Sequence, residues 1–345
     1  MKIRNVLAID GGGVRGIVAA VLLDALDGER RALGAQRPLS DCFDLLAGTS
    51  TGAIIAGGLV APDKTGEGPR ATPAVLRDLY RSESANIFPR RFWCRLPVIG
   101  RLRQFFGPLY RPDALIRILT NLLGDASFSD LRRNLIISSY AIDPRGAAFF
   151  RGGPDYAGKT LPQGVTPPAL GVSLVDAIVG SAAAPTFFPP HQIRDRNTGD
   201  ISTVIDGGVF LNDPALLALA EAVMLFPDDD IRVISVGTGR LTNPYPFNRA
   251  RSWGFFEWLS PVGEFRTPLI SAISDGQARA VNAQMKKLLG ASHYHRFDYD
   301  LSLGYGSPNL DDASRTNMKR LEEGALKMAE KMRPQIREVA KLLDP

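Results

Sequence analysis

The sequence predicts an α/β fold of three layers, in which a mainly parallel central sheet lies between helices on both faces. Apolar runs at 6–9 and 43–47 each lead into a glycine-rich turn, and residues with helical apolar spacing follow both turns. Two strand–turn–helix units favour parallel strands joined by crossover helices. Hydrophobic residues make up 45% and charged residues 22% of the 345 residues, so the chain can bury a large core.

Further strands are expected at 134–142, 202–205, 231–236 and 294–299, and a long helix at about 311–343. We expect one domain over 1–345, because α/β folds of this length often form one unit with insertions. The regular alternation of strand and helix patterns is interrupted at about 61–124. We interpret this stretch as a basic, aromatic, lid-like insertion. A C-terminal helical segment is expected at about 310–345. The glycine- and proline-rich stretches 152–168 and 240–268 are expected to be loops.

Composition limits the compartment and the membrane topology. Lys and Arg outnumber Asp and Glu by 41 to 36, a formal charge of +5 that favours approach to anionic surfaces. Cys42 and Cys94 are too few for a disulfide framework, which indicates a reducing compartment. The apolar run near the start is too short for a signal peptide, and no stretch reaches the about 18 apolar residues of a membrane-spanning helix. We expect a cytoplasmic protein, with peripheral contact at the inner face of the membrane left open.

The first chemical motif is Gly-x-Ser-x-Gly at 48–52. Gly48 and Gly52 allow a sharp turn from strand to helix that exposes the hydroxyl of Ser50, as in a nucleophile elbow. A serine at a helix N-terminus also lies where the helix dipole favours developing negative charge. The alternative is an ordinary N-cap serine.

The second motif is a glycine cluster after the first strand, followed by a basic residue. Its backbone N–H groups are unobstructed, so two of them could hold an oxyanion, with the basic side chain adding positive potential. The spacing of Gly11, Gly13 and Gly16 also fits a dinucleotide-binding turn, but the second strand does not end in the acid that such a site requires. The candidate oxyanion-hole residues are Gly11, Gly12, Gly13 and Arg15.

A serine nucleophile needs a base, and histidine is scarce in this chain. His191 follows two prolines in an expected loop, whereas His293 and His295 alternate at the start of an expected strand. The order Ser50, Asp206, His293 would suit an α/β-hydrolase triad, which remains an alternative. Asp206 ends another expected strand, before Gly207 and Gly208, and an aspartate can take the serine proton itself if burial raises its pKa.

These motifs, taken in order, resemble those of the patatin-like phospholipases. DGGGVRG at 10–16 is similar to the oxyanion-hole turn of that family, and GTSTG at 48–52 is similar to its elbow. SAAAP at 181–185, continuing into TFFP, resembles the block that lines the acyl-binding region. DGG at 206–208 with NDP at 212–214 resembles the catalytic-aspartate turn, and SVGTG at 235–239 fits a further motif at the sheet end.

The resemblance implies a patatin-like three-layer sandwich and a lipid acyl hydrolase of phospholipase A type. It implies that Ser50 and Asp206 form a catalytic dyad acting through an acyl-enzyme on membrane glycerolipids, without metal or cofactor. Gly16, Gly48, Gly52, Gly207 and Gly208 would support the motifs. The resemblance also admits a defence effector activated by a cyclic nucleotide, and a non-catalytic lipid-binding protein remains a further alternative. The residues predict no oligomeric state.

Residues 88–111 combine six arginines with six aromatic residues and no acid. Such a segment suits peripheral membrane contact, in which arginines meet lipid phosphates and aromatic rings enter the headgroup region. Prolines interrupt any long helix, so a lid over the active site or a solvated basic face are alternatives. The same mixture could bind single-stranded nucleic acid, but no nucleic-acid-binding fold accompanies it, so we expect no such partner.

Overall fold

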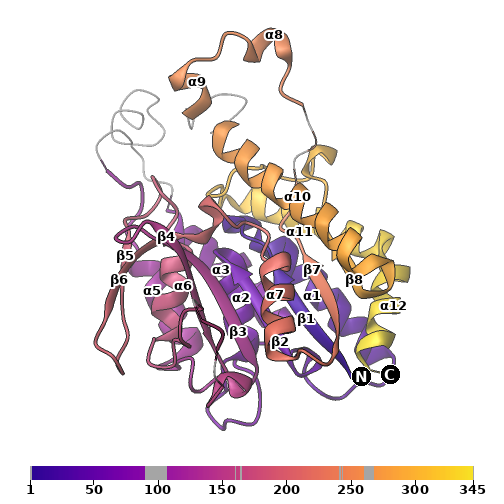
Figure 1. Ribbon diagram of the computed structural model, residues 1–345. Helices are drawn as coiled ribbons and strands as arrows, with labels where there is room; N and C mark the ends of the chain where they lie inside the picture. The colour runs from indigo at the N-terminus through magenta and orange to yellow at the C-terminus, as the bar shows by residue number, and fades with distance from the viewer. Residues whose placement is uncertain are drawn as a thin grey trace.

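The computed structural model describes residues 2–89, 107–159, 161–163, 165–240, 242, 244–259 and 268–344 of the chain, and it has the predicted three layers (Figure 1). The described strands are β1 (Ile3–Ile9), β2 (Leu45–Thr49), β3 (Asn134–Ala141), β4 (Gly146–Gly152), β5 (His191–Arg194), β6 (Ile201–Asp206), β7 (Asp230–Val236) and β8 (Tyr294–Phe297). The described helices are α1 (Gly16–Ala32), α2 (Thr51–Val60), α3 (Pro73–Ile87), α5 (Asp113–Leu123), α6 (Leu174–Ser181), α7 (Ala215–Leu225), α8 (Phe247–Ala250), α9 (Phe255–Leu259), α10 (Pro268–His293), α11 (Arg315–Lys331) and α12 (Arg333–Leu343).

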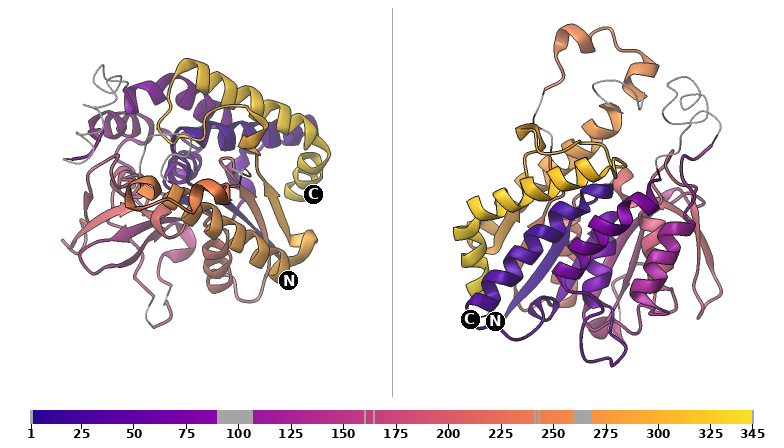
Figure 2. Two further views of the ribbon diagram at one scale, coloured as in Figure 1. Left: turned by 90° about the horizontal axis from the view of Figure 1, so that it is seen from above. Right: turned by 180° about the vertical axis from the view of Figure 1, so that it is seen from behind.

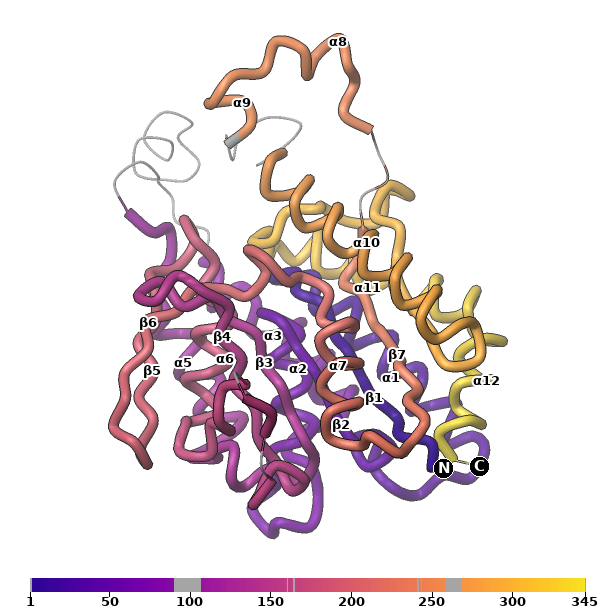
Figure 3. Tube along the Cα trace, viewed as in Figure 1, coloured from indigo at the N-terminus to yellow at the C-terminus, as the bar shows by residue number. Residues whose placement is uncertain are grey.

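The sheet has a parallel centre and an antiparallel edge. Neighbours in the run β3-β2-β1-β7-β8 are parallel, as the two strand–turn–helix units predict. β4 and β6 pair with β3 in the antiparallel sense, and β5 pairs with β6 as a hairpin that projects at the edge of the fold (Figure 3). All parallel strands point their carboxyl ends to the same edge, where ligands bind in open α/β sheets.

Side chains of the central strands alternate between two cores. Leu7, Ile9 and Leu46 face one core, which is covered by α1, α2, α3, α5, α6, α11 and α12. Val6 and Ala8 face the other core, which is covered by α7 and α10. The two opposite views of the ribbon show these helical layers on either side of the sheet (Figures 1 and 2). This alternation confirms the three-layer prediction.

The structure adds two strands that the sequence analysis did not predict. β4 continues from β3 through a tight turn, and β5 begins at His191, so this histidine lies in a strand rather than in the expected loop. His293 is the last residue of α10 and not a strand residue. The long helix expected at 311–343 is two helices, α11 and α12, because Pro334 cannot continue a helix and begins the second.

The stretch expected as an insertion at 61–124 contains two packed helices. Leu76 of α3 and Leu119 of α5 are fully buried in the larger core, so these helices belong to the helical layer. Residues 90–106, which hold most of the basic aromatic segment 88–111, lie outside the described residues. Residues of the first strand and of the last two helices belong to the same core. No helix in the described ranges is long and apolar enough to cross a bilayer.

Candidate active site

Ser50 lies at a sharp turn between β2 and α2. Its φ of 54° and ψ of −119° are strained for a residue with a side chain, as at a nucleophile elbow. The flanking glycines are needed for space: a Cβ on Gly48 would lie 2.5 Å from the Gly52 carbonyl oxygen, and one on Gly52 would lie 2.1 Å from that of Ile9. The Ser181 hydroxyl accepts a hydrogen bond from the Ser50 N–H (2.9 Å) and holds the turn.

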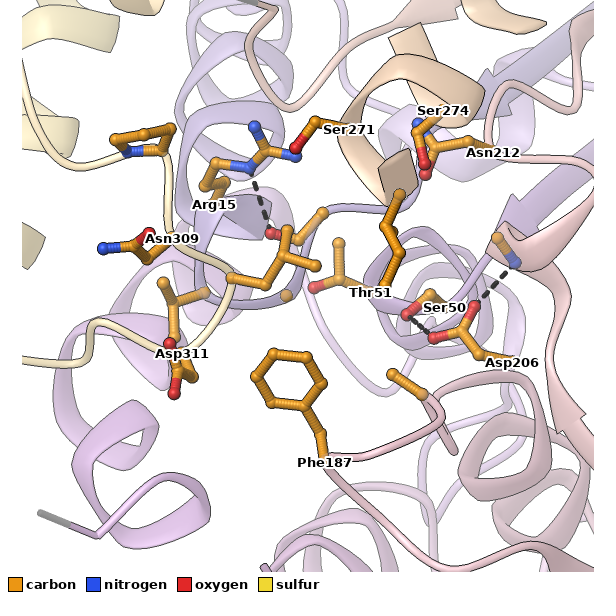
Figure 4. Close-up of a pocket in the computed structure, with 18 of the residues that line it drawn as sticks. Arg15, Ser50, Thr51, Phe187, Asp206, Asn212, Ser271, Ser274, Asn309 and Asp311 are labelled. Carbon is orange, nitrogen blue, oxygen red and sulfur yellow. Dashed lines mark hydrogen bonds between the residues drawn. The ribbon is translucent and has the colours of Figure 1, made fainter. Parts of the chain in front are cut away.

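The sheet register brings Asp206 to Ser50. β2 pairs with β3 as far as Thr49 opposite Ser138, and β6 arrives from the opposite direction with Asp206 opposite Ser139. Since β4 occupies the other edge of β3, β2 and β6 use the same edge, end to end. The Ser50 hydroxyl donates a 2.6 Å hydrogen bond to Oδ2 of Asp206, as Figure 4 shows.

Burial sets the electrostatics of this pair. Ser50 is 8% exposed and Asp206 is 6% exposed. Desolvation raises the pKa of Asp206 to about 6, although hydrogen bonds from Ser50 and from the Gly208 N–H (2.6 Å) favour its ionised form. A Cβ on Gly207 would lie 2.4 Å from the Ser138 carbonyl oxygen, so a side chain there would push Asp206 away. A carboxylate with a pKa near the working pH is suited to accept a proton from the serine.

The three glycines predicted to hold an oxyanion differ in their surroundings. Gly11 donates its N–H to the Asn212 carbonyl oxygen (3.0 Å), so this amide is occupied, contrary to its assignment as an oxyanion donor. Gly12 and Gly13 line the cavity at Ser50, and their N–H groups have no acceptor among the residues that the structure describes. Gly13 has a φ of 57°, which favours glycine. Gly12 and Gly13 therefore remain the candidate donors.

Arg15 contributes to the same cavity through its side chain. Its Nε donates to the Gly12 carbonyl oxygen (3.3 Å) and its Nη1 donates to the Gly239 carbonyl oxygen (3.3 Å), as Figure 4 shows for the first contact. Both bonds fix the glycine turn as well as placing a cation beside it. Gly16 begins α1, where a Cβ would lie 2.3 Å from the Thr51 hydroxyl.

A cavity of about 910 Å³ opens above Ser50 and Asp206. One part of its wall is apolar and contains Phe187 and Phe188 from the block 181–189, with Ile54, Ile87, Phe88 and Leu115. The rings of Phe88 and Phe188 both contact Tyr110, which closes this side. The other part is polar and contains Arg15, Asn212, Ser271, Ser274, Asp275 and Arg279. An elongated ligand with one apolar and one polar end fits such a wall.

The three histidines all lie elsewhere in the described part of the chain. His191 of the edge hairpin contacts Asp176 (3.0 Å), and His293 is half-buried beside Ser292 (2.9 Å). His295 lies within β8, opposite Ile234. None of the three is among the residues that line the cavity, so the geometry does not favour the alternative triad.

A buried ionic network beneath the glycine turn was not predicted from the sequence. Arg296 of β8 donates from Nη1 to Asp10 (2.8 Å), Asp213 (3.0 Å) and Ser235 (2.7 Å), and from Nη2 to Asp298 (2.9 Å). Burial raises the pKa of Asp10 well above its usual range, although Arg296 opposes this shift. The network ties the ends of β1, β7 and β8 together, and the only signal in the sequence is an arginine within an expected strand.

Arg296→Leu is expected to lower the free energy of unfolding by about 3–5 kcal/mol, because it leaves buried carboxylates without their cation. Arg296→Lys should lose less, since it keeps the charge but not the forked geometry. Denaturant-induced unfolding of both variants beside Arg194→Leu, which removes an exposed arginine, measures the effect. Equal midpoints for Arg296→Leu and Arg194→Leu would mean that the network does not stabilise the fold.

Asp206→Asn is expected to stabilise the protein at pH 8. The folded-state pKa of about 6 exceeds the unfolded value, so the native state binds more protons, and stability falls as the pH rises from about 4 to about 6. Above that range the buried charge costs up to about 3 kcal/mol, which the amide avoids. Thermal unfolding should show a higher midpoint for the variant at pH 8 and little difference at pH 4, whereas Asp228→Asn, at an exposed site, should change neither. A variant less stable than wild type at pH 8 would contradict this.

Several known proteins are similar to this chain. A family model described as Patatin-like phospholipase matches residues 7–219. Patatin-like protein 1 of Arabidopsis thaliana is 31% identical, covering 95% of this chain and 81% of that protein, and Patatin-like protein 2 of Oryza sativa subsp. indica is 30% identical, covering 93% and 82%. A structure of human GIVD cytosolic phospholipase A2 aligns at 12% identity with a TM-score of 0.44, covering 99% of this chain and 60% of that chain. The matched range contains both Ser50 and Asp206.

Proposed function

The chain belongs to the patatin-like phospholipase family, and from this premise we propose that it is a phospholipase A-type lipid acyl hydrolase in which Ser50 and Asp206 form the catalytic dyad. Membership makes the chain a hydrolase of lipid esters. The observation that carries the finer proposal is the 2.6 Å hydrogen bond from the strained serine to a buried carboxylate at the floor of the cavity.

The dyad can perform both halves of the reaction. Asp206 takes the hydroxyl proton of Ser50 while the serine oxygen attacks the acyl carbon, and the N–H groups of Gly12 and Gly13 hold the oxyanion. The ester bond then breaks, the lysolipid oxygen receives the proton from Asp206, and an acyl-enzyme remains. Water repeats the sequence: Asp206 removes its proton, hydroxide attacks the acyl carbon, and Ser50 recovers its proton as the fatty acid leaves.

The cavity wall supports a glycerolipid as the substrate. The apolar wall at Ile54, Phe187 and Phe188 suits a fatty-acyl chain, and the polar wall at Arg15, Ser271 and Arg279 suits the glycerol and headgroup side. The susceptible ester would then lie between the two walls, above Ser50. We propose membrane phospholipid as the substrate class on this basis.

The test is product analysis with a phospholipid whose two acyl chains differ in mass. Incubation with the purified full chain should release free fatty acid and the matching lysophospholipid, and the mass of the acid identifies the ester cleaved. Release of diacylglycerol or phosphatidic acid instead would place cleavage at a phosphate ester and contradict the proposal. Absence of any product from vesicles, micelles and monomeric esters alike would also contradict it.

A further inference from the structure

Three phenylalanines project from the segment that follows β7. Phe247 of α8 is 79% exposed, and Phe255 and Phe256 of α9 are 73% and 66% exposed. They are the most exposed large hydrophobic side chains in the described part of the chain. Large apolar side chains gathered on a surface are characteristic of an interaction site, because leaving them in water carries a free-energy cost.

The segment that carries these side chains also contributes to the cavity wall. Pro244 and Tyr245, from the same segment, line the cavity. Ile270 and Ile273, in the first turns of α10, line it too and are 38% and 49% exposed. Figures 1 and 3 show α8 and α9 beyond the N-terminal end of α10. We call Phe247, Phe255, Phe256, Ile270 and Ile273 the apolar rim.

Aromatic contacts join the other large side chains of this segment. The Trp253 ring packs edge-on against Tyr245 (centroids 5.5 Å apart) and against Trp258 (5.1 Å). The Tyr245 hydroxyl donates to the carbonyl oxygen of Pro268, the first residue of α10 (3.4 Å). The polar-tipped aromatic rings of this segment are half-buried, whereas the three phenyl rings are exposed. This division matches segments that enter the interface of a bilayer.

The charges on this segment select a lipid surface as the partner. Arg249 and Arg251 are exposed beside the apolar rim, and Glu257 is the only acid of residues 244–259. Arginines at the margin of an apolar patch can pair with lipid phosphates while the patch enters the hydrocarbon boundary. The partner must also supply a lipid to the cavity, whose wall includes Ile270 and Ile273 of the apolar rim.

We propose that the apolar rim inserts into the surface of a bilayer containing anionic phospholipid, and so places the cavity mouth against its substrate. The inference rests on the proposed function. It is separate from the docking expected for 88–111, because the residues of the apolar rim belong to another segment of the chain.

The test compares a rim variant, Phe247→Ser with Phe255→Ser and Phe256→Ser, with a matched control, Val223→Ser with Leu288→Ser and Leu326→Ser. The control residues are 51%, 62% and 50% exposed and lie on α7, the far part of α10 and α11. Binding is measured by flotation with phosphatidylcholine–phosphatidylglycerol vesicles, in the Ser50→Ala background so that the lipid stays intact. The rim variant should bind at least about 30-fold more weakly, and the control as tightly as its parent.

A second measurement separates docking from catalysis. With Ser50 restored, the rim variant should hydrolyse a monomeric short-chain ester at the wild-type rate but lose vesicle hydrolysis in proportion to binding.

Unchanged vesicle binding would overturn the inference, as would equal loss on both substrates. A dimer in lipid-free solution that only the rim variant dissociates, with vesicle binding unchanged, would make the apolar rim a contact between copies instead. Weakened binding with no hydrolysis by wild type would support docking while refuting the proposed function.

Discussion

Ser50→Ala is expected to lower fatty-acid release by about 10⁴-fold or more. The variant removes the proposed nucleophile, while Gly12, Gly13 and the cavity wall remain to give residual catalysis. Thr51 cannot substitute, because its hydroxyl is engaged with the Tyr80 hydroxyl. The measurement is the initial rate on phospholipid and on a chromogenic acyl ester.

Ser82→Ala is the matched control for this loss. Ser82 lies on the exposed face of α3, so its replacement makes the same chemical change outside the site. It should retain the wild-type rate. Residual activity of Ser50→Ala within tenfold of wild type would show that another group attacks the ester.

Asp206→Asn is expected to lower kcat/KM by about 10²–10⁴-fold at neutral pH, the usual contribution of a positioned base. The amide can keep contacts with the Ser50 hydroxyl and the Gly208 N–H, so the loss reports proton transfer rather than collapse of the site. In wild type, kcat/KM should rise with pH through about 6 and then level, because only the ionised carboxylate accepts the proton. The variant should lack this rise of kcat/KM with pH.

The double variant His293→Ala, His295→Ala is the control for the base. Neither imidazole lines the cavity, so wild-type kcat/KM and the same pH profile are expected. A loss comparable to that of Asp206→Asn would restore the triad alternative. An Asp206→Asn variant with an unchanged rate would refute the dyad whatever the histidines do.

Local sequence patterns predicted those parts of the site whose residues lie close together in the sequence. The elbow needs Gly48 and Gly52 beside Ser50, and the strand before Asp206 is readable from its apolar pattern. Their meeting depends on β6 reaching β3 beyond the end of β2, a register that only the assembled sheet supplies. The scarcity of histidine led to the prediction of Asp206 as the partner of Ser50, and its carboxylate accepts a hydrogen bond from that serine.

Interactions between distant segments account for what the sequence did not predict. The local sequence makes Gly11 as good a candidate oxyanion donor as Gly12 and Gly13. In the fold, its N–H instead donates to the carbonyl oxygen of Asn212, 201 residues later. Arg296 in the last strand donates a hydrogen bond to Asp10, and no local sequence pattern predicts that pairing. β5 is short and follows two prolines, so it gains its structure by pairing with β6 rather than from its own propensity.

Covalent labelling tests the central claim most directly. A fluorophosphonate mimics the acyl group and traps the activated serine as a stable adduct, which intact-mass analysis and peptide mapping locate. The dyad predicts one adduct, on Ser50, forming at a rate that rises through about pH 6 and falls at least about 100-fold in Asp206→Asn. An adduct on another residue, or an undiminished labelling rate in Asp206→Asn, would contradict a mechanism in which Asp206 activates Ser50.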